Sequence, residues 1–219
     1  MKICGLDLSM NGSGLVSFEL DNNLDIISTD YLGFIQVKKH CSKQIIHYRK
    51  KDFDHRYHIS AMMTEKITEF VKGSDYLAIE DYAFGAKGNT FDIGEFIGQI
   101  KMSLFKAGYK VRLYDPNSIK KFATGKGNSD KISMYLAFKK DTEIKPDLSS
   151  YPVPSKGSGA APTSDIVDAY YIARLLRVEI LLRKGLISAS QLSEEEISIF
   201  NRTTKSRPVN LLDTEFLKK

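Results

Sequence analysis

Short apolar runs and longer segments of helical periodicity follow one another along this chain. Residues 3–8 form an apolar run that only Asp7 interrupts, and residues 76–80 form a second run that ends at Glu80. Runs of this kind are typical of strands buried on both faces of a sheet. Each of the two predicted strands therefore carries one acidic side chain at or beside the core.

The other elements follow from turn residues, caps and helical spacing. Polar turns after the first run predict an antiparallel meander of three strands. Caps and apolar spacing predict helices between and after the strands. In chain order we expect strands at 3–8, 15–20 and 26–35, a helix from 59 to about 73, a strand at 76–80, a helix at 90–107, a strand at 109–114, a short helix after Asp115-Pro116, helices from Ser129 to Phe138 and from 165 to 184, and a small helix capped by Ser193 and Glu196.

This order of elements predicts an α/β fold with one mixed five-stranded sheet, an antiparallel meander plus parallel strands, covered by helices on both faces. A right-handed crossover would place the strand ending at Glu80 beside the first strand. The 219 residues suffice for one domain with its own core. We expect this domain over residues 1–184, with a basic insertion at about 36–58 and a C-terminal extension over 185–219.

Composition excludes several classes of protein. Two cysteines, Cys4 and Cys41, are too few for a disulfide scaffold or a four-cysteine zinc site. No apolar run approaches the ~20 residues of a membrane span, and no charged-then-apolar presequence opens the chain. We expect a soluble protein of a reducing compartment, without a membrane partner. Its location would be the cytoplasm, that of a bacterial host if the gene belongs to a phage.

Positive charge is concentrated in two segments. The chain has 32 Lys and Arg against 27 Asp and Glu, but residues 36–58 carry seven against two and residues 101–140 carry ten against two. Such segments suit a polyanion such as nucleic acid, because each neutralised phosphate releases counterions. A solvated charged face is the alternative. All four histidines lie in the first segment, but with Cys41 their spacing fits no standard zinc site.

Four carboxylates are predicted to meet at one place. Asp7 lies within one buried strand and Glu80 ends another. Asp165 and Asp168 face inward at the N-terminal end of a helix, although Asp165 alone could merely favour that terminus. Enclosing several carboxylates is costly unless a cation compensates them. Mg²⁺ or Mn²⁺ accepts all-oxygen sites, and two ions about 4 Å apart can promote phosphodiester hydrolysis.

Basic residues accompany the predicted acidic cluster. The loop at 124–127, Thr-Gly-Lys-Gly, would bring backbone close to phosphates, and Lys131 in the following first turn can reach a developing charge. The alternative for this loop is a flexible surface turn. It lacks the spacing of a Walker A loop.

On these residues the sequence resembles the RuvC-type Holliday-junction resolvases, which have the ribonuclease H-like fold. The resemblance covers residues 1–37 and 59–184. Its blocks are Ile3-Cys4-Gly5-Leu6-Asp7-Leu8-Ser9 with Gly12-Ser13-Gly14, then Ala78-Ile79-Glu80-Asp81-Tyr82, then Pro116-Asn117-Ser118-Ile119-Lys120-Lys121 with Thr124-Gly125-Lys126-Gly127 and Asp130-Lys131, and finally Asp165-Ile166-Val167-Asp168-Ala169. The resemblance implies four catalytic metal ligands, Asp7, Glu80, Asp165 and Asp168. It also implies phosphate or DNA contacts by Lys120, Lys121, Lys126 and the catalytic Lys131.

The same resemblance implies an aromatic wedge next to the second acidic strand. Tyr82 and Phe84 lie in a glycine-rich loop that also contains Lys87. Family members insert an aromatic ring at this place into the centre of the junction, where base stacking contributes about 1–3 kcal/mol. Either ring could serve here. A ring folded back onto the core is the alternative.

The helix at 90–107 has two apolar faces. One carries Ile93, Phe96, Ile97, Ile100 and Leu104, and the other carries Phe91, Gly94, Gly98, Met102 and Phe105. One face must pack on the sheet, and the second resembles the homodimer interface of the family. Two active sites related by a twofold axis suit paired nicks in a four-way junction. Burial beneath another helix of the same chain is the alternative.

The resemblance therefore implies a crossover junction endodeoxyribonuclease of DNA recombination and repair. It would cut four-way and other branched DNA by Mg²⁺-dependent hydrolysis with paired nicks, using two ions per site, and Mn²⁺ would substitute. The insertion and the tail are longer than in bacterial members, which suits a phage or other viral origin. Three alternatives remain: a less selective debranching nuclease, a non-enzymatic DNA-binding scaffold, and a nucleotide-binding protein of the actin and sugar-kinase superfamily.

Overall fold

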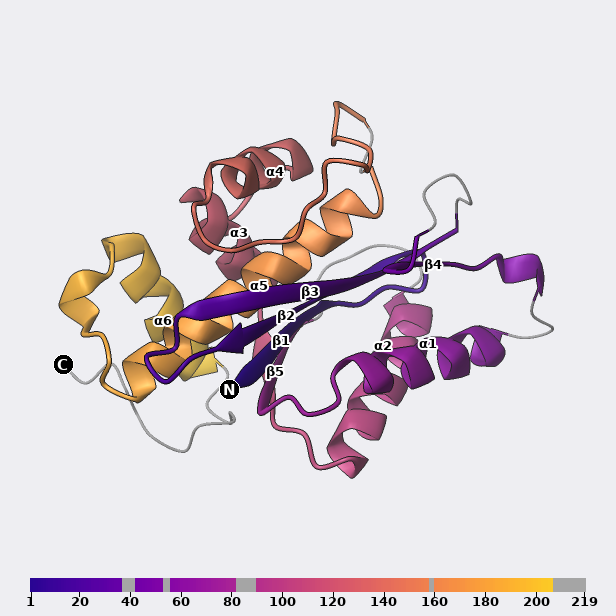
Figure 1. Cartoon of the computed structure of the whole chain (residues 1–219), viewed down its shortest axis with the longest axis horizontal. Coiled ribbons are helices and arrows are strands. Elements are labelled where there is room, and N and C mark those ends of the chain that lie inside the picture. The colour runs from indigo at the N-terminus through magenta and orange to yellow at the C-terminus, as the bar shows by residue number, and fades with distance from the viewer. Residues whose placement is uncertain (37–41, 53–55, 82–89, 158–159, 207–219) are drawn as a thin grey trace.

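The fold is built on a six-stranded mixed sheet (Figure 1). The computed structural model describes residues 1–36, 42–52, 56–81, 90–157 and 160–206. The strand order across the sheet is β4-β3-β2-β1-β5-β6. The strands are β1 Lys2–Asp7, β2 Ser13–Leu20, β3 Ile26–Ile35, β4 Ile45–His47, β5 Tyr76–Glu80 and β6 Val111–Tyr114.

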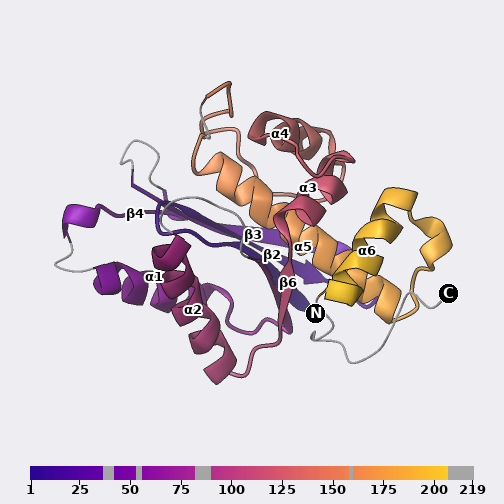
Figure 2. The same ribbon diagram turned by 180° about the vertical axis from the view of Figure 1, so that it is seen from behind.

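Helices cover both faces of this sheet, as the sequence predicts (Figures 1 and 2). Helix α5 lies against β1 and β2, with α3, α4 and α6 on the same side, whereas α1 and α2 lie on the other. The helices are α1 Arg56–Phe70, α2 Thr90–Lys106, α3 Pro116–Thr124, α4 Lys131–Lys140, α5 Thr163–Arg183 and α6 Glu194–Ser206, with short 3₁₀ turns η2 at Lys50–Asp52 and η3 at Ala189–Gln191.

The meander and the crossover agree with the sequence prediction. Strands β1, β2 and β3 pair antiparallel, and β5 lies parallel to β1 with β6 beyond it. Helix α3 begins as expected, with Asp115 as N-cap and Pro116 in its first turn. Ser193 and Glu196 exchange the two hydrogen bonds of a capping box before the last helix.

Two predictions about elements were wrong. The sheet has six strands rather than five, because Ile45–His47, inside the predicted insertion, pairs in parallel with the end of β3. A three-residue strand among cationic neighbours is too short to show an alternating pattern. Helix α4 is capped by Asp130 rather than Ser129, since the Asp130 carboxylate accepts a hydrogen bond from the Ser133 amide at 2.8 Å.

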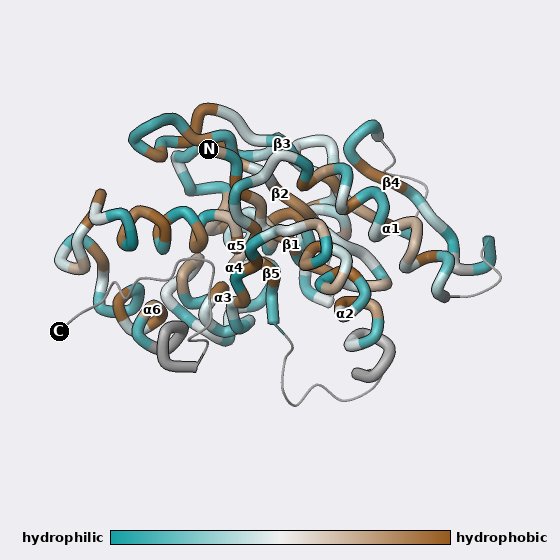
Figure 3. Tube along the Cα trace, turned by 90° about the horizontal axis from the view of Figure 1, so that it is seen from below, coloured by the Kyte–Doolittle hydropathy of each residue, from teal (hydrophilic) through white to brown (hydrophobic). Residues whose placement is uncertain are grey.

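Alternate residues of the central strands face two separate apolar cores. Ile3 and Ala78 pack towards α5, whereas Cys4, Leu6 and Ile79 pack towards α1 and α2. Figure 3 shows hydrophobic stretches in the central strands. The C-terminal helix α6 contributes Phe200 to the α5-side core. Among the helices that the structure describes, none is both long and apolar enough to span a membrane.

Candidate active site

Two acids lie side by side at the carboxyl-terminal ends of two neighbouring strands, β1 and β5, along one edge of the sheet. Leu6 of β1 is directly opposite Ile79 of β5 in a parallel pair, so Asp7 and Glu80 occupy the next position on neighbouring strands. Gly5 and Ala78, two positions before the acids, face α5. Because side chains alternate along a strand, Asp7 and Glu80 point to the same side. The sheet register alone therefore places these two carboxylates together.

Glycines bring the start of α5 onto this edge. A Cβ atom at Gly14 would lie 2.1 Å from the Asp165 carbonyl oxygen, and one at Gly5 would lie 2.3 Å from the Ala169 carbonyl oxygen. Only glycine permits such close contact between strand and helix backbones. The N-terminal turns of α5, with Asp165 and Asp168, are held against the carboxyl end of β1 for this reason.

The four carboxylates line one open cavity of about 740 Å³. Lys120 from α3 and Lys131 from α4 line it as well, together with Asn11 and Gly12 of the β1–β2 loop. Strand ends, a helix N-terminus and two further helices thus contribute charged side chains to a single space. The sequence predicted this gathering of the four acids.

A hydrogen-bonded group connects Lys131 to the acids. Its Nζ donates to Ser164 Oγ at 3.2 Å and lies 3.4 Å from Asp165 Oδ1. Ser164 Oγ donates in turn to Asp165 Oδ1 at 3.0 Å. Ser164 is buried, and it fixes the carboxylate and the amine relative to each other.

The acids repel one another within this enclosure. Loss of hydration, followed by the charges of Glu80, Asp168 and Asp165, raises the pKa of Asp7 well above its usual range. Burial, then Asp168, raises the pKa of Glu80 to about 7, although Lys120 and Lys131 oppose the rise. Burial raises the pKa of Asp168 to about 6, against the effect of Lys131. The cavity therefore favours added positive charge.

The pKa of Lys131 is also raised, but by the neighbouring carboxylates and against the effect of burial. Burial lowers the pKa of its amine, but the carboxylates of Asp165, Asp168 and Asp7 outweigh that effect and leave the pKa above its usual value. The amine is therefore a permanent cation at neutral pH. It compensates part of the acidic charge but not all of it.

The donor set fits a hard divalent cation. Carboxylate oxygens are the ligands that Mg²⁺ and Mn²⁺ prefer, and the raised pKa values show that the acids lack full compensation. Within the ranges that the structure describes, no three His, Cys, Asp or Glu side chains lie close enough together to bind one metal ion. The four carboxylates surround the cavity instead of converging on one point.

The other predicted residues are distributed differently. Lys121 lies away from the acidic cavity, and its Nζ donates to Ser198 Oγ of α6 at 2.8 Å. Lys126 lies in the exposed turn between α3 and α4 and does not line the cavity. The predicted DNA-binding residues Tyr82, Phe84 and Lys87 lie outside the described residues.

Sequence reasoning missed two features of the site. Ser164 was not predicted to contribute, although a serine directly before an inward-facing aspartate in a first helical turn is a usable signal. The apolar run at residues 3–8 does not indicate the close contact of Gly5 with α5 either, because that contact depends on the helix that crosses the strand. The first depends on how α4 packs beside α5, and the second on how closely α5 approaches the sheet.

The mixed sheet with helices on both faces has the ribonuclease H-like α/β fold, and comparison with solved structures agrees. A Thermus thermophilus RuvC structure matches with a TM-score of 0.55 and 16% identity, over 85% of this chain and 98% of that chain. T. thermophilus RuvC in complex with a Holliday junction substrate gives 0.53 and 19%, over 85% and 97%. A Fowlpox virus resolvase in complex with Holliday junction DNA gives 0.41 and 15%, over 83% and 99%.

The chain therefore has the RuvC-type fold, which confirms the predicted fold class. No family model matches the sequence, and no curated protein matches it either.

Proposed function

We propose that this protein is a metal-dependent endonuclease that resolves four-way and branched DNA by paired nicks, a crossover junction endodeoxyribonuclease. The observation that carries the proposal is the cavity in which four carboxylates from β1, β5 and α5 face two lysines. The RuvC fold supports it, since one structural neighbour was solved with a Holliday junction as its substrate. Activity in DNA recombination and repair would follow from that substrate.

Each part of the cavity has a role in this proposal. Asp7, Glu80, Asp165 and Asp168 would hold two Mg²⁺ ions, which when bound supply an activated water and stabilise the leaving oxygen. Lys131, fixed by Ser164, would bind the scissile phosphate and stabilise the charge that develops on it. Lys120 would hold the neighbouring phosphate against the acidic wall. The products would carry 5′-phosphate and 3′-hydroxyl ends.

Contacts outside the cavity would extend along the junction. Lys121, Lys126 and Lys87 would neutralise backbone phosphates, and Tyr82 or Phe84 would stack on an unpaired base at the branch point. These assignments depend on the likeness to the RuvC-type resolvases. Alanine variants of the two aromatic residues would separate branch selectivity from cutting.

One assay tests the proposal against its alternatives. A synthetic four-way junction, a Y-fork and a linear duplex are incubated with Mg²⁺, Mn²⁺ or EDTA and with wild type, Asp7→Asn or Asp30→Asn. We expect symmetric nicking of the junction that requires metal. Nicking should persist in Asp30→Asn, a control at an exposed position, and disappear in Asp7→Asn. Equal cutting of the Y-fork would favour a debranching nuclease. ATP turnover without cutting would favour the kinase-like alternative, and binding alone a scaffold.

We also propose that two copies associate through α2. Its inner face is buried, whereas Met102 is 54% and Phe105 is 74% exposed, beside a shallow groove that includes Gly98. Sedimentation equilibrium should give a dimer for wild type and a monomer for Phe105→Glu. Leu136→Glu, at a 53% exposed position on α4, is the matched control and should remain dimeric. A monomeric wild type, alone and on junction DNA, would contradict the dimer.

A further inference from the structure

Strand β4 brings the basic insertion to the same edge of the sheet as the acids. Ile45 pairs with Gly33, Gly33 with Gly14, and Gly14 with Asp7, so β4 begins level with Asp7 across the sheet. β4 runs parallel to β3 and hence in the same direction as β1. His47 and the residues after it therefore project beyond the edge at which the carboxylates lie.

Two side chains of the basic insertion, at about residues 36–58, form hydrogen bonds with the β1–β2 loop that lines the acidic cavity. The Tyr48 hydroxyl, from a nearly buried ring, donates to the Met10 carbonyl oxygen. Gln36 Nε2 donates to the backbone and side-chain oxygens of Asn11, each at 3.4 Å. Asn11 is part of the cavity lining. The position of β4 relative to the acids is therefore fixed by direct contact.

The electrostatics of Tyr48 report the same proximity. Burial raises the pKa of its hydroxyl to about 12, the hydrogen bond with Gln36 lowers it, and the Asp165 carboxylate raises it. Tyr48 thus lies close enough to the acidic cluster to experience its charge.

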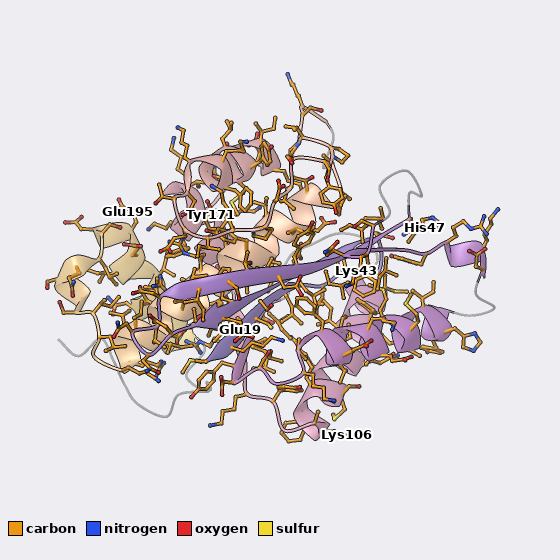
Figure 4. The ribbon with its side chains drawn as sticks, viewed as in Figure 1. Glu19, Lys43, His47, Lys106, Tyr171 and Glu195 are labelled. Atoms are coloured by element: carbon orange, nitrogen blue, oxygen red, sulfur yellow. The ribbon has the colours of Figure 1, made fainter. Side chains whose placement is uncertain are left out.

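The cations of this segment point to solvent. Lys43 and Lys51 are exposed, and neither is paired with a carboxylate in the part of the chain that the structure describes. Arg49 pairs with Asp52 at 2.7 Å, but both side chains are about half exposed, and such pairs contribute little stability. Figure 4 shows Lys43 and His47 at β4, far along the sheet from Glu195 of α6.

We propose that Lys43, Arg49 and Lys51 form a platform that binds the phosphate backbone of one DNA arm next to the cut. The inference rests on the proposed nuclease function and names a substrate contact for it. Strands about 4.8 Å apart place β4 about 14 Å from β1, which corresponds to about four base pairs of duplex. The hydrogen bonds of Tyr48 and Gln36 to the loop that lines the acidic cavity favour this role over a surface that is only solvated.

The first experiment measures binding without cutting. Wild type and the triple variant Lys43→Gln, Arg49→Gln, Lys51→Gln are titrated into a fluorescent four-way junction in EDTA at several KCl concentrations. Loss of two to three phosphate contacts should weaken binding about tenfold at 150 mM salt and lower the slope of log K against log salt by about two. The control triple variant Lys72→Gln, Lys110→Gln, Lys184→Gln removes equal charge from exposed positions outside this segment. It should match wild type within twofold, and equal losses in the two triple variants would overturn the platform.

A second experiment locates the contact. Neutral methylphosphonate linkages are placed singly along one arm of the junction, and those about three to five nucleotides from the cut should weaken wild type but not the platform variant. Equal sensitivity of both proteins at every position would overturn the proposal. A protein that binds through these side chains but cuts no junction would instead contradict the nuclease function and leave the platform intact.

Discussion

Helix α5 carries carboxylates near both ends, and their surroundings differ. Near its C-terminal end, Glu179 is paired with Arg112 at 3.0 Å and with Arg183 at 2.9 Å, and all three side chains are at most 2% exposed. The Tyr114 hydroxyl adds a hydrogen bond at 2.5 Å. Near its N-terminal end, Asp165 and Asp168 share a cavity with three further acids, Asp7, Glu80 and Asp130, and with two lysines.

The difference distinguishes the cluster around Glu179, which stabilises the fold, from the acids around the cavity, which suit a functional site. A buried carboxylate with matched cations and hydrogen bonds holds β6 to α5, and loss of one partner leaves an uncompensated charge. Carboxylates with raised pKa values that face an open cavity contribute no such stability. They are maintained at a cost in folding free energy, which is the pattern of a functional site. Each prediction below tests this comparison.

Removing one charge at each end of α5 should give the largest and most divergent effects. Asp168→Asn should lower junction cleavage at least about 10³-fold, because a ligand in the cavity is lost, while the protein becomes no less stable. Glu179→Gln should lower the free energy of unfolding by about 3–5 kcal/mol and leave the activity of the folded protein largely intact. Cleavage assays and urea unfolding of both variants measure this. A stable, inactive Glu179→Gln would reverse the assignment.

The close approach of α5 to the sheet gives the next largest effect. Gly5→Ala should destabilise the protein by about 3 kcal/mol and reduce cleavage, because the added methyl group meets the backbone of α5. Gly98→Ala is the matched control, since nothing lies within 4 Å of that position and alanine favours a helix by about 0.5–1 kcal/mol. The changes in unfolding temperature of the two variants should therefore have opposite signs. Unfolding is measured in dilute solution, because Gly98 lies in the groove of the proposed dimer. Similar losses in both variants would contradict the packing of α5.

The dependence of stability on pH follows from the raised pKa values. Glu80 and Asp168 bind protons more tightly in the folded state, so their contribution is full below about pH 4 and is lost as pH rises through 6 and 7. Without metal, stability should fall by about 2–3 kcal/mol between pH 5 and pH 8. Mg²⁺ should restore it at pH 8 and have little effect at pH 5. A flat profile, or equal rescue at both pH values, would contradict the cluster; Glu80→Gln should flatten the curve.

The smallest effect is expected at Ser164. Ser164→Ala removes the hydroxyl between Lys131 and Asp165, worth about 1 kcal/mol, so kcat should fall up to about tenfold with KM little changed. Ser164→Thr keeps the hydroxyl and should recover most of the rate. Single-turnover cleavage of the junction measures both. An unaltered rate in the alanine variant would show that Lys131 needs no such support.

Much of the fold could be predicted because its signals are local. The apolar runs around Asp7 and Glu80, the Asp115-Pro116 cap and the periodicity of α5 each lie within a few residues. The gathering of the four acids also followed, since strand ends and an inward helix face restrict where side chains point. The extra strand β4 could not be predicted, because pairing with β3 rather than any pattern in three residues makes Ile45–His47 a strand.

The sequence by itself determined the helices, most of the strands and the four acids at their ends, since burial periodicity and capping are properties of neighbouring residues. Only the tertiary structure decided that Gly5 and Gly14 admit the backbone of α5, that Ser164 joins Lys131 to Asp165, and that Lys121 turns to α6 instead of the cavity. These are contacts between segments far apart in the chain. Their geometry depends on how closely helices approach the sheet and one another, and no short stretch of sequence encodes that packing.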